Sequence, residues 1–348
     1  MPLFYNVIEA AAHRLSIVPP MFDYFGALAL HALVAAARLG VFDALRERPL
    51  TERELAAALG VDPVATGVLL RTLAGLGYLR VRGGRYRLSR AARLWFTTGS
   101  PTSLVAGLEF WERTACVIWP EIERAVRGGA PVTPFYALLE GDPALSRSFQ
   151  AWTAALARRQ APAVARAVPV PSGARRMLDV GGGHGLFSVA LLRRHPALRA
   201  TVIDLPQALR AAADHPRLTP RAGSFLEDDL GDGYDVVLLF NVVHGLTDDE
   251  TAALLRRLAA ALNPGGTLVV GDQFGDSLMP GRASRALLHL LDLNYLVAVG
   301  GKVRGRREIA ALLRAAGFRD VRHRRPLRSP VTELAVARTP SRSAPRRA

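Results

Sequence analysis

The sequence has very little lysine and cysteine. Lys302 is the only lysine among 45 basic residues, and Cys116 is the only cysteine among 348 residues. A single cysteine excludes an intrachain disulfide and a cysteine-based zinc site. We also expect no other metal centre. It is also typical of a protein of the reducing cytoplasm.

The chain also lacks a long uninterrupted apolar run. The most apolar helix candidate, Tyr24 to Phe42, contains His31 and Arg38 and is therefore a poor membrane span. Glu9 and His13 interrupt the first apolar residues too early for a secretory signal. We expect a soluble cytoplasmic protein with no membrane partner.

The positive net charge of +15 raises the possibility of nucleic-acid binding. The arginines are dispersed, however, apart from residues 319–328 and the tail after Arg338. Their excess over lysine, together with abundant alanine, is typical of codon bias in a GC-rich genome. We therefore do not expect a nucleic-acid partner. The tail at residues 339–348 has no apolar period and is predicted to be disordered.

The first hundred residues have the pattern of a winged helix. Thr51 and Glu54 have capping-box spacing at the start of one helix, and a second helix is expected from Pro63 to Leu76. Residues 78–88 then predict a hairpin with a Gly-Gly turn. The second helix is too apolar to be a good reader of base edges, so we expect it to pack against another domain or subunit. Further helices are predicted at 5–17, 24–39, 90–97, 104–127, 133–140 and 143–167.

A proline-rich linker, Val168–Gly173, precedes a regular alternation of strands and helices. Such alternation predicts an α/β fold with a mostly parallel sheet covered on both faces, and the last two strands would add an antiparallel edge. Strands are predicted near 176–180, 199–204, 218–222, 234–240, 266–271, 318–323 and 331–337. Helices are predicted near 185–194, 206–215, 248–262, 282–297 and 306–316.

A glycine-rich turn joins the first strand of this region to its first helix. Glycines stand at positions 181, 183 and 185, where backbone N–H groups can approach a ligand closely. The dehydrogenase fingerprint would need a glycine where Leu186 stands. The observed spacing resembles instead the S-adenosylmethionine loop of class I methyltransferases. Asp204 ends the second strand, 23 residues after Gly181, where its carboxylate can accept both ribose hydroxyls of a nucleoside.

Two further polar residues are predicted at the same sheet edge. A buried strand from Asp235 leads to Asn241 and His244, and an imidazole at this position could take a proton from a phenol. Asp272 ends the next strand and could hold the tautomer of His244, although a loop-anchoring role fits it equally well.

Over nearly its whole length the chain resembles the S-adenosylmethionine-dependent O-methyltransferases of the plant caffeate and bacterial hydroxyneurosporene type. The resemblance is carried by Leu178–Gly185, Asp204-Leu205-Pro206, Asn241-Val-Val-His244, Asn263-Pro-Gly-Gly266, Gly300-Gly301-Lys302 and Ala315-Ala-Gly-Phe318. It implies a class I methyltransferase Rossmann-like sheet preceded by a mainly helical winged-helix domain. The domains would be a dimerisation domain at 1–100, a helical connector at 101–170 that contributes to the acceptor pocket, a cofactor-binding catalytic domain at 171–338 and the tail.

The resemblance also implies a homodimer, a small-molecule acceptor and S-adenosylmethionine as cofactor. The general base would be His244, supported by Asp272. The implied cofactor contacts are Gly181, Gly183, Asp204, Leu205, Ser224, Phe225, Phe240 and Asn241. The acceptor pocket would be walled by Phe149, Trp152, Asn294 and Tyr295, although core packing is an equal alternative for Phe149 and Trp152.

Four departures from the family pattern keep other functions open. The family usually has Asp where Ser224 stands, a basic residue where Phe240 stands and Asp-Trp where Gly245-Leu246 stand, and plant members have an acid where Val303 stands. O-methylation of a small aromatic or polyketide-like metabolite is the function we expect. Carbon or nitrogen methylation, a methyltransferase-fold enzyme that does not methylate, and a winged-helix regulator that senses a nucleoside-like ligand are the alternatives.

Overall fold

The computed structural model describes residues 19–275, 282–326 and 333–341. The predicted helix at 5–17 and residues 342–348 of the tail predicted at 339–348 lie outside these residues. The first residue of that tail is ordered, because Thr339 donates its N–H to the carbonyl of Gly266 at 3.0 Å and its hydroxyl to the carbonyl of Asn263 at 2.7 Å. The chain divides into two compact units. The N-terminal unit runs to Cys116 and includes Ala151–Ala155, and the C-terminal unit contains Val117–Gln150 and the chain from Leu156 onward. The domain boundaries at residues 100 and 170 stay predictions.

Helices and one hairpin form the N-terminal unit. Its elements are α2 (Pro19–Arg38), α3 (Val41–Glu47), α4 (Glu52–Leu59), α5 (Pro63–Gly75), β1 (Leu79–Arg82), β2 (Arg85–Leu88), α6 (Arg90–Trp95) and α7 (Val105–Val117). The predicted capping box begins α4: Thr51 N–H donates to Glu54 Oε2 at 2.7 Å, and Glu54 N–H donates to Thr51 Oγ1 at 3.2 Å. The short helix α3 was not predicted. Gly40, with a φ of 80°, separates it from α2.

The helices after residue 104 differ from the prediction in one place. The expected single helix at 104–127 is broken into α7, a 3₁₀ turn η1 (Trp119–Glu121) and α8 (Ile122–Gly128). Pro120 lies at the break, and its missing N–H cannot continue the hydrogen bonds of a helix. Two more helices follow, α9 (Phe135–Gly141) and α10 (Pro143–Ala167). Asp142 caps α10 by accepting the N–H groups of Ala144 and Leu145.

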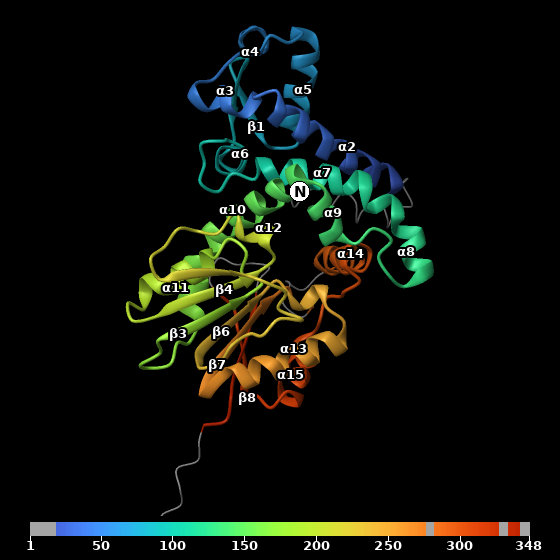
Figure 1. Ribbon diagram of the computed structural model, residues 1–348. Coiled ribbons are helices and arrows are strands. Elements are labelled where there is room, and N and C mark those ends of the chain that lie inside the picture. The colour runs from blue at the N-terminus through green and yellow to red at the C-terminus, as the bar shows by residue number, and fades with distance from the viewer. Residues whose placement is uncertain (1–18, 276–281, 327–332, 342–348) are drawn as a thin grey trace, which may run out of the picture. The chain divides into compact units, whose positions relative to one another are not determined.

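A seven-stranded sheet lies at the centre of the C-terminal unit (Figure 1). Its strands are β3 (Arg176–Val180), β4 (Arg199–Asp204), β5 (Leu218–Ala222), β6 (Tyr234–Phe240), β7 (Leu262–Asp272), β8 (Arg319–Arg324) and β9 (Glu333–Arg338). Their order is β5-β4-β3-β6-β7-β9-β8. The first five strands in this order, β5, β4, β3, β6 and β7, pair in parallel, whereas β9 is antiparallel to both β7 and β8. The predicted mostly parallel sheet with an antiparallel last strand is confirmed.

Helices cover both faces of this sheet because its strands are apolar on both sides. Along β6, Val237 and Leu239 belong to a core cluster with α13 (Asp248–Ala261) and α15 (Arg306–Ala315). Val236 and Leu238 belong to a second cluster with α10 and α11 (Leu186–Arg194). Figure 1 shows α13 and α15 together on one side of the sheet and α11 on the other. Because successive side chains of a strand point to opposite faces of the sheet, the residues of β6 alternate between the two core clusters.

One predicted helix of this unit is much shorter than expected. The helix expected at 206–215 is confined to α12 (Pro206–Leu209). The chain then leaves the helical path, and Ala213 donates its N–H to the carbonyl of His184 at 3.0 Å. A long-range backbone contact has replaced further helical turns. The remaining helix, α14 (Arg282–Val299), agrees with the prediction apart from its end.

Among the described residues, no single helix is long and apolar enough to cross a membrane. Two bent helix pairs of the N-terminal unit, Asp23–Arg38 with Val41–Glu47 and Glu52–Leu59 with Pro63–Gly75, meet the length and composition required.

Candidate active site

The carboxyl ends of four neighbouring parallel strands bring together the polar residues predicted for the site. In the sheet order, β4, β3, β6 and β7 are consecutive. Asp204 ends β4, the glycine turn follows β3, Asn241 follows β6 and Asp272 ends β7. Ligands bind to open parallel sheets at such an edge. The candidate site is therefore a row of strand ends.

The backbone of the glycine turn has conformations that residues other than glycine adopt only with strain. Gly181, Gly183 and Gly185 have φ values of 65°, 46° and 65°, in the left-handed region. A Cβ on Gly181 would also lie 2.7 Å from Cγ2 of Val242. The turn therefore needs glycine for both conformation and space, as its predicted role in close ligand approach requires.

Asp204 is held by two backbone donors. The N–H of Gly183 reaches Oδ2 at 2.8 Å, and the N–H of Leu205 reaches Oδ1 at 2.7 Å. Burial raises the pKa of Asp204, and these two hydrogen bonds oppose the rise. Each carboxylate oxygen has a further lone pair, so the group can still accept hydroxyl protons from a ligand.

A second carboxylate, Asp179, lies beneath the glycine turn, and its contacts were not predicted. It is 2% exposed and accepts a 2.6 Å hydrogen bond from the hydroxyl of Ser188. A Cβ on Gly182 would lie 2.5 Å from Cγ of Asp179, so the turn rests directly on this carboxyl group. Burial raises the pKa of Asp179 to about 7, Ser188 opposes the rise and Asp204 adds to it.

His244 and Asp272 form a direct pair. His244 lies in a 3₁₀ turn, η2 (Val243–Gly245), and its Nδ1 is 2.8 Å from Asp272 Oδ1. The backbone N–H groups of His244 and Gln273 also donate to this carboxylate, at 3.3 and 2.8 Å. The side chain of Asp272 is 2% exposed and that of His244 is 16% exposed. The carboxylate accepts the Nδ1 proton, so Nε2 is left as a proton acceptor.

Tyr295 covers one face of this imidazole. The two rings are stacked, with centroids 4.1 Å apart and planes 8° apart. Tyr295 donates its hydroxyl to Gln273 Oε1 at 2.5 Å, and Gln273 Nε2 donates to Asn241 Oδ1 at 3.0 Å. Asn241 has a φ of 54°, an uncommon value outside glycine that is often found at functional sites. Tyr295 and Asn241 are thus joined at the site through Gln273.

Gln273 and Tyr136 are site residues that the sequence reasoning missed. Gln273 could have been found, because it directly follows Asp272 at a strand end. Tyr136 lies on α9, where no motif indicates it. Its pKa is raised to about 12, first by loss of solvent and then by the negative charges of Asp204 and Asp272. Tyr136 is 50% exposed, so its loss of solvent is only partial.

The residues predicted to wall the acceptor pocket have different neighbours, and their role in a pocket stays a prediction. Phe149 packs edge-to-face on Phe135 in the C-terminal unit, with centroids 5.2 Å apart. Trp152 belongs to the N-terminal unit and stacks on Phe110 at 5.2 Å. Asn294 accepts a hydrogen bond from the indole of Trp119 at 3.1 Å. Of the four, Tyr295 contacts His244.

The remaining predicted cofactor residues also differ in placement. Phe225 lies near the glycine turn, since its Cε1 would be 3.5 Å from a Cβ on Gly181. Ser224 donates its backbone N–H to Asp228 Oδ2 at 2.7 Å. Phe240 is 6% exposed and packs edge-to-face on Phe187, so its ring is part of the core.

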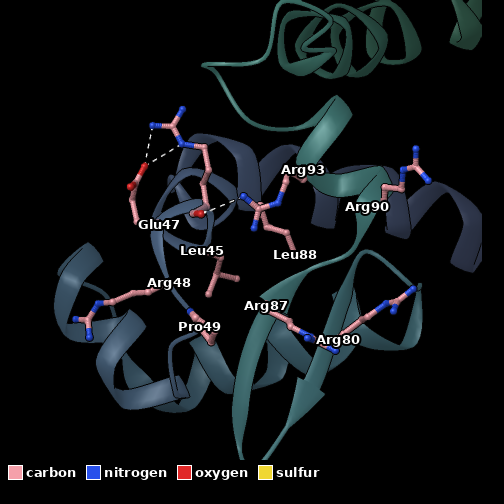
Figure 2. Close-up of a pocket in the computed structure, with 10 residues that line it drawn as sticks. Leu45, Glu47, Arg48, Pro49, Arg80, Arg87, Leu88, Arg90 and Arg93 are labelled. Atoms are coloured by element: carbon pink, nitrogen blue, oxygen red, sulfur yellow. Dashed lines mark hydrogen bonds and ion pairs between the residues drawn. The ribbon is translucent and has the colours of Figure 1, made fainter.

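A pocket of about 470 Å³ occurs elsewhere, in the N-terminal unit (Figure 2). It contains none of the predicted site residues. Its lining consists of six arginines, one glutamate and three other residues: Arg46, Arg48, Arg80, Arg87, Arg90, Arg93, Glu47, Leu45, Pro49 and Leu88. In Figure 2 the guanidinium groups of Arg48 and Arg90 point in opposite directions, away from the centre. The arginines therefore do not converge on one point.

Comparison with known proteins agrees with this geometry. Residues 129–319 match the O-methyltransferase domain, and residues 23–98 match the O-methyltransferase dimerisation domain. The chain is 31% identical to the 3-hydroxy-5-methyl-1-naphthoate 3-O-methyltransferase of Streptomyces sahachiroi over 302 residues, 83% of this chain and 86% of that one. It is 33% identical to the mitomycin biosynthesis 6-O-methyltransferase of Streptomyces lavendulae over 314 residues, covering 84% and 86%.

A solved structure supports the same assignment. Human N-acetylserotonin methyltransferase, crystallised in complex with S-adenosylmethionine, superimposes with a TM-score of 0.81 at 27% identity, over 95% of this chain and 98% of that one. The predicted methyltransferase fold is thus confirmed. The matches span both units and the strand ends described above, and the chain belongs to the O-methyltransferase family, as its motifs predicted.

Proposed function

We propose that this chain transfers a methyl group from S-adenosylmethionine to a hydroxyl of a small aromatic or polyketide-like molecule. The observation that carries the proposal is the His244–Asp272 pair, held at 2.8 Å beside the strand that leads into the glycine turn. Relatives named as acting on a hydroxynaphthoate and in mitomycin biosynthesis support the class of acceptor.

The residues at the glycine turn fit the cofactor. A ribose needs an acceptor for its two hydroxyls, and the carboxylate of Asp204 is oriented for this by Gly183 and Leu205. The left-handed glycines leave the backbone of the turn open to a ligand. When bound, S-adenosylmethionine supplies a methyl group on a positively charged sulfur.

His244 then accepts the acceptor's proton. Asp272 fixes Nδ1 as the protonated nitrogen, so Nε2 can take the hydroxyl proton as the oxygen becomes nucleophilic. The same carboxylate stabilises the imidazolium that forms. Tyr295 holds the ring plane by stacking and so restricts the direction in which Nε2 points. Positioning contributes the rest of the rate, because in-line transfer needs the two reacting atoms close together.

This arrangement favours oxygen as the methylated atom. A hydroxyl must lose a proton during attack, and the structure provides a supported base for it. Val303 stands where plant members have a second acid, so this chain would work with one His–Asp pair and no further carboxylate at that position. Carbon or nitrogen methylation needs no such pair for a carbon or amine that is already nucleophilic.

We infer that the protein acts as a homodimer formed by its N-terminal unit. Large apolar side chains of this unit are exposed on α2 and α5, which pack against each other: Tyr24, Phe25, Leu28, Val64 and Val68. Exposed apolar groups of this kind are typical of an interface. Replacing Phe25 and Leu28 by Asp should give a monomer in sedimentation equilibrium, whereas Arg82→Asp on the hairpin should leave a dimer. A dimer in both variants would contradict this interface.

Calorimetric titration with S-adenosylhomocysteine tests the cofactor site first. We expect micromolar binding by the wild-type protein and its loss in Asp204→Ala. Asp214→Ala, a change outside the candidate site, is the matched control and should bind normally. Absence of binding by folded wild-type protein would contradict the proposed function. Binding would justify a screen of phenolic acceptors with the labelled methyl donor.

A further inference from the structure

The turn that carries His244 is short and needs support from outside. Its two internal hydrogen bonds run from Gly245 N–H to the Val242 carbonyl at 3.0 Å and from Leu246 N–H to the Val243 carbonyl at 3.3 Å. No side chain caps η2, and the left-handed Asn241 precedes it. A turn with so few bonds of its own does not by itself hold an imidazole in one place.

The segment Gly301–Arg304 supplies this support. The N–H of Lys302 donates to the carbonyl of His244 at 3.0 Å. A Cβ on Gly301 would lie 1.8 Å from that carbonyl oxygen, so no other residue fits there without a shift of the backbone. Lys302 Nζ also pairs with Asp248 at 2.9 Å and with Glu308 at 2.7 Å. The backbone of this segment thus lies directly against the His244 turn.

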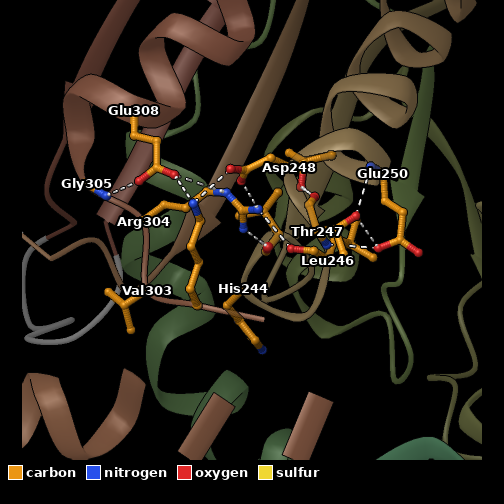
Figure 3. Close-up of polar contacts among 12 residues, drawn as sticks. His244, Leu246, Thr247, Asp248, Glu250, Val303, Arg304, Gly305 and Glu308 are labelled. Atoms are coloured by element: carbon orange, nitrogen blue, oxygen red, sulfur yellow. Dashed lines mark hydrogen bonds and ion pairs between the residues drawn. The ribbon is translucent and has the colours of Figure 1, made fainter. Parts of the chain in front are cut away.

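Arg304 makes the most extensive of these contacts (Figure 3). It is 2% exposed, and its guanidinium donates from Nη1 to the Val243 carbonyl and from Nη2 to the Leu246 carbonyl at 2.8 Å. The same Nη2 pairs with Asp248 Oδ1 at 2.8 Å. The two carbonyls lie on either side of His244 in sequence, so one planar group holds both ends of the turn.

From these contacts we propose that Arg304 is a positioning residue for His244. It does not touch the imidazole; it acts by fixing the backbone from which the imidazole projects. Arginine suits this role because its donors form a rigid fork, whereas lysine offers a single ammonium group. The carboxylates of Asp248 and Glu308 balance the buried positive charge. The proposal rests on the proposed role of His244 as base.

The same segment reaches the other side of the imidazole. Val303 donates its N–H to Asp292 Oδ1 at 2.7 Å, and Asp292 lies on α14 three residues before Tyr295. Tyr295 is the ring that stacks on His244. Arg304 and Val303 therefore connect the turn that carries the base with the helix that carries its stacking partner.

Arg304→Lys tests the proposal, because it keeps the charge and removes the fork. The matched control is Arg306→Lys, since Arg306 donates to the buried Glu333 at 2.8 Å and belongs to the same region of the chain. The first readout is the histidine ring spectrum by NMR, with the His244 signals assigned by their loss in His244→Asn. We expect Arg304→Lys to shift the His244 ring signals and their pH titration, and Arg306→Lys to leave both unchanged.

The second readout is methyl transfer over a range of pH. We expect Arg304→Lys to lower kcat by about ten- to a hundredfold, since a displacement of about 1 Å can cost a hundredfold. The pH–rate profile should move with the NMR titration, and the Kd for S-adenosylhomocysteine should change less than about twofold, because the contacts of Asp204 are untouched. In Arg306→Lys, kcat and the pH profile should stay as in the wild type.

The outcomes separate this proposal from the proposed function. Unchanged His244 signals in Arg304→Lys, or equal changes in both variants, would overturn the positioning role. Shifted signals with an unchanged kcat would support positioning and contradict the role of His244 as base. If Arg304→Lys does not fold, Asp248→Asn replaces it, with Asp249→Asn as control. Asp248 is a partner of Arg304 with a half-exposed side chain, and unchanged His244 signals in that variant would overturn the proposal.

Discussion

Arginine has two contrasting settings in this chain. In the C-terminal unit, Arg304 is buried, and two carbonyl groups and a carboxylate accept from it (Figure 3). In the N-terminal unit, six exposed arginines line the pocket of Figure 2. Of these, Arg46 pairs with Glu47 at 2.9 Å and Arg93 donates to the carbonyl of Arg46 at 3.2 Å. Arg80 and Arg87 stand directly opposite each other across the hairpin.

The contrast shows that the structural role of an arginine depends on the buried hydrogen-bond acceptors around it, and not on how many guanidinium groups lie together. Arg304 is one group, yet it determines the path of a turn, because removing it would leave buried acceptors without donors. The side chains of the exposed arginines are in contact with water, so their loss leaves groups that water can still solvate. A high arginine content therefore predicts little until the neighbours of each residue are known.

The largest effect should come from His244, the proposed base. We expect His244→Ala to lower kcat by about 10²–10⁴, the usual contribution of a general base. Arg80→Ala, in the pocket of the N-terminal unit, should leave kcat unchanged. Both are measured by transfer of a labelled methyl group at saturating cofactor. A fall below about tenfold in His244→Ala would contradict the base role.

The next effect concerns stability and compares the two settings directly. We expect Arg304→Met to lower the free energy of unfolding by about 3 kcal/mol, because it leaves buried carbonyls without donors. Arg48→Met, an exposed arginine of the Figure 2 pocket, should change it by less than about 0.5 kcal/mol, as exposed substitutions do. Urea unfolding followed by circular dichroism measures both. Equal losses would mean that burial does not distinguish these arginines.

A buried carboxylate of the C-terminal unit and a carboxylate of the N-terminal unit should make stability depend on pH in opposite directions. The pKa of the buried Asp179 is raised to about 7 from 3.8, so the folded protein retains a proton that the unfolded chain has released. Stability therefore falls as the pH rises from about 4 to about 7, by a few kcal/mol at most, and Asp179→Asn should remove this fall.

Glu54 in the N-terminal unit is the matched carboxylate. Its pKa is lowered from 4.5 to about 2 by the N–H of Thr51 and then by Arg85. Its contribution to stability is present above about pH 4.5 and is lost as the pH falls toward 2. Glu54→Gln should flatten this acid limb and leave the region from pH 5 to 8 unchanged. A flattened neutral region in Glu54→Gln would contradict the assignment of that region to Asp179.

Much of the sheet was predictable because its local signals agree with one another. The predicted strands at 176–180, 199–204 and 234–240 match β3, β4 and β6 residue for residue. Most of their residues are apolar and buried. The glycines of the turn stand at positive φ values that favour glycine. Together with Asp204, they indicate the edge of the sheet that we propose binds the cofactor.

Long-range contacts account for what was missed. The shortness of α12 depends on a bond from Ala213 to His184, and the placement of Trp152 depends on Phe110. Arg304 follows the motif Gly300-Gly301-Lys302, yet an arginine in a sequence is normally assigned to the surface. Its acceptors lie 58 and 61 residues away along the chain. No local pattern indicates partners at such a separation.

The smallest effect should come from the pair of like charges in the hairpin. Arg80 and Arg87 face each other across β1 and β2, an arrangement that costs stability. Arg87→Thr should therefore stabilise the protein, by about 0.2–1 kcal/mol. Arg82→Thr is the control: Arg82 faces Arg85, which donates to both oxygens of Glu54 at 2.8 and 3.1 Å, so its gain should be smaller. Thermal unfolding at low salt measures both gains. At 1 M salt the Debye length shrinks to about 3 Å, and the gain in Arg87→Thr should vanish; a gain that persists would assign it to strand propensity instead of charge.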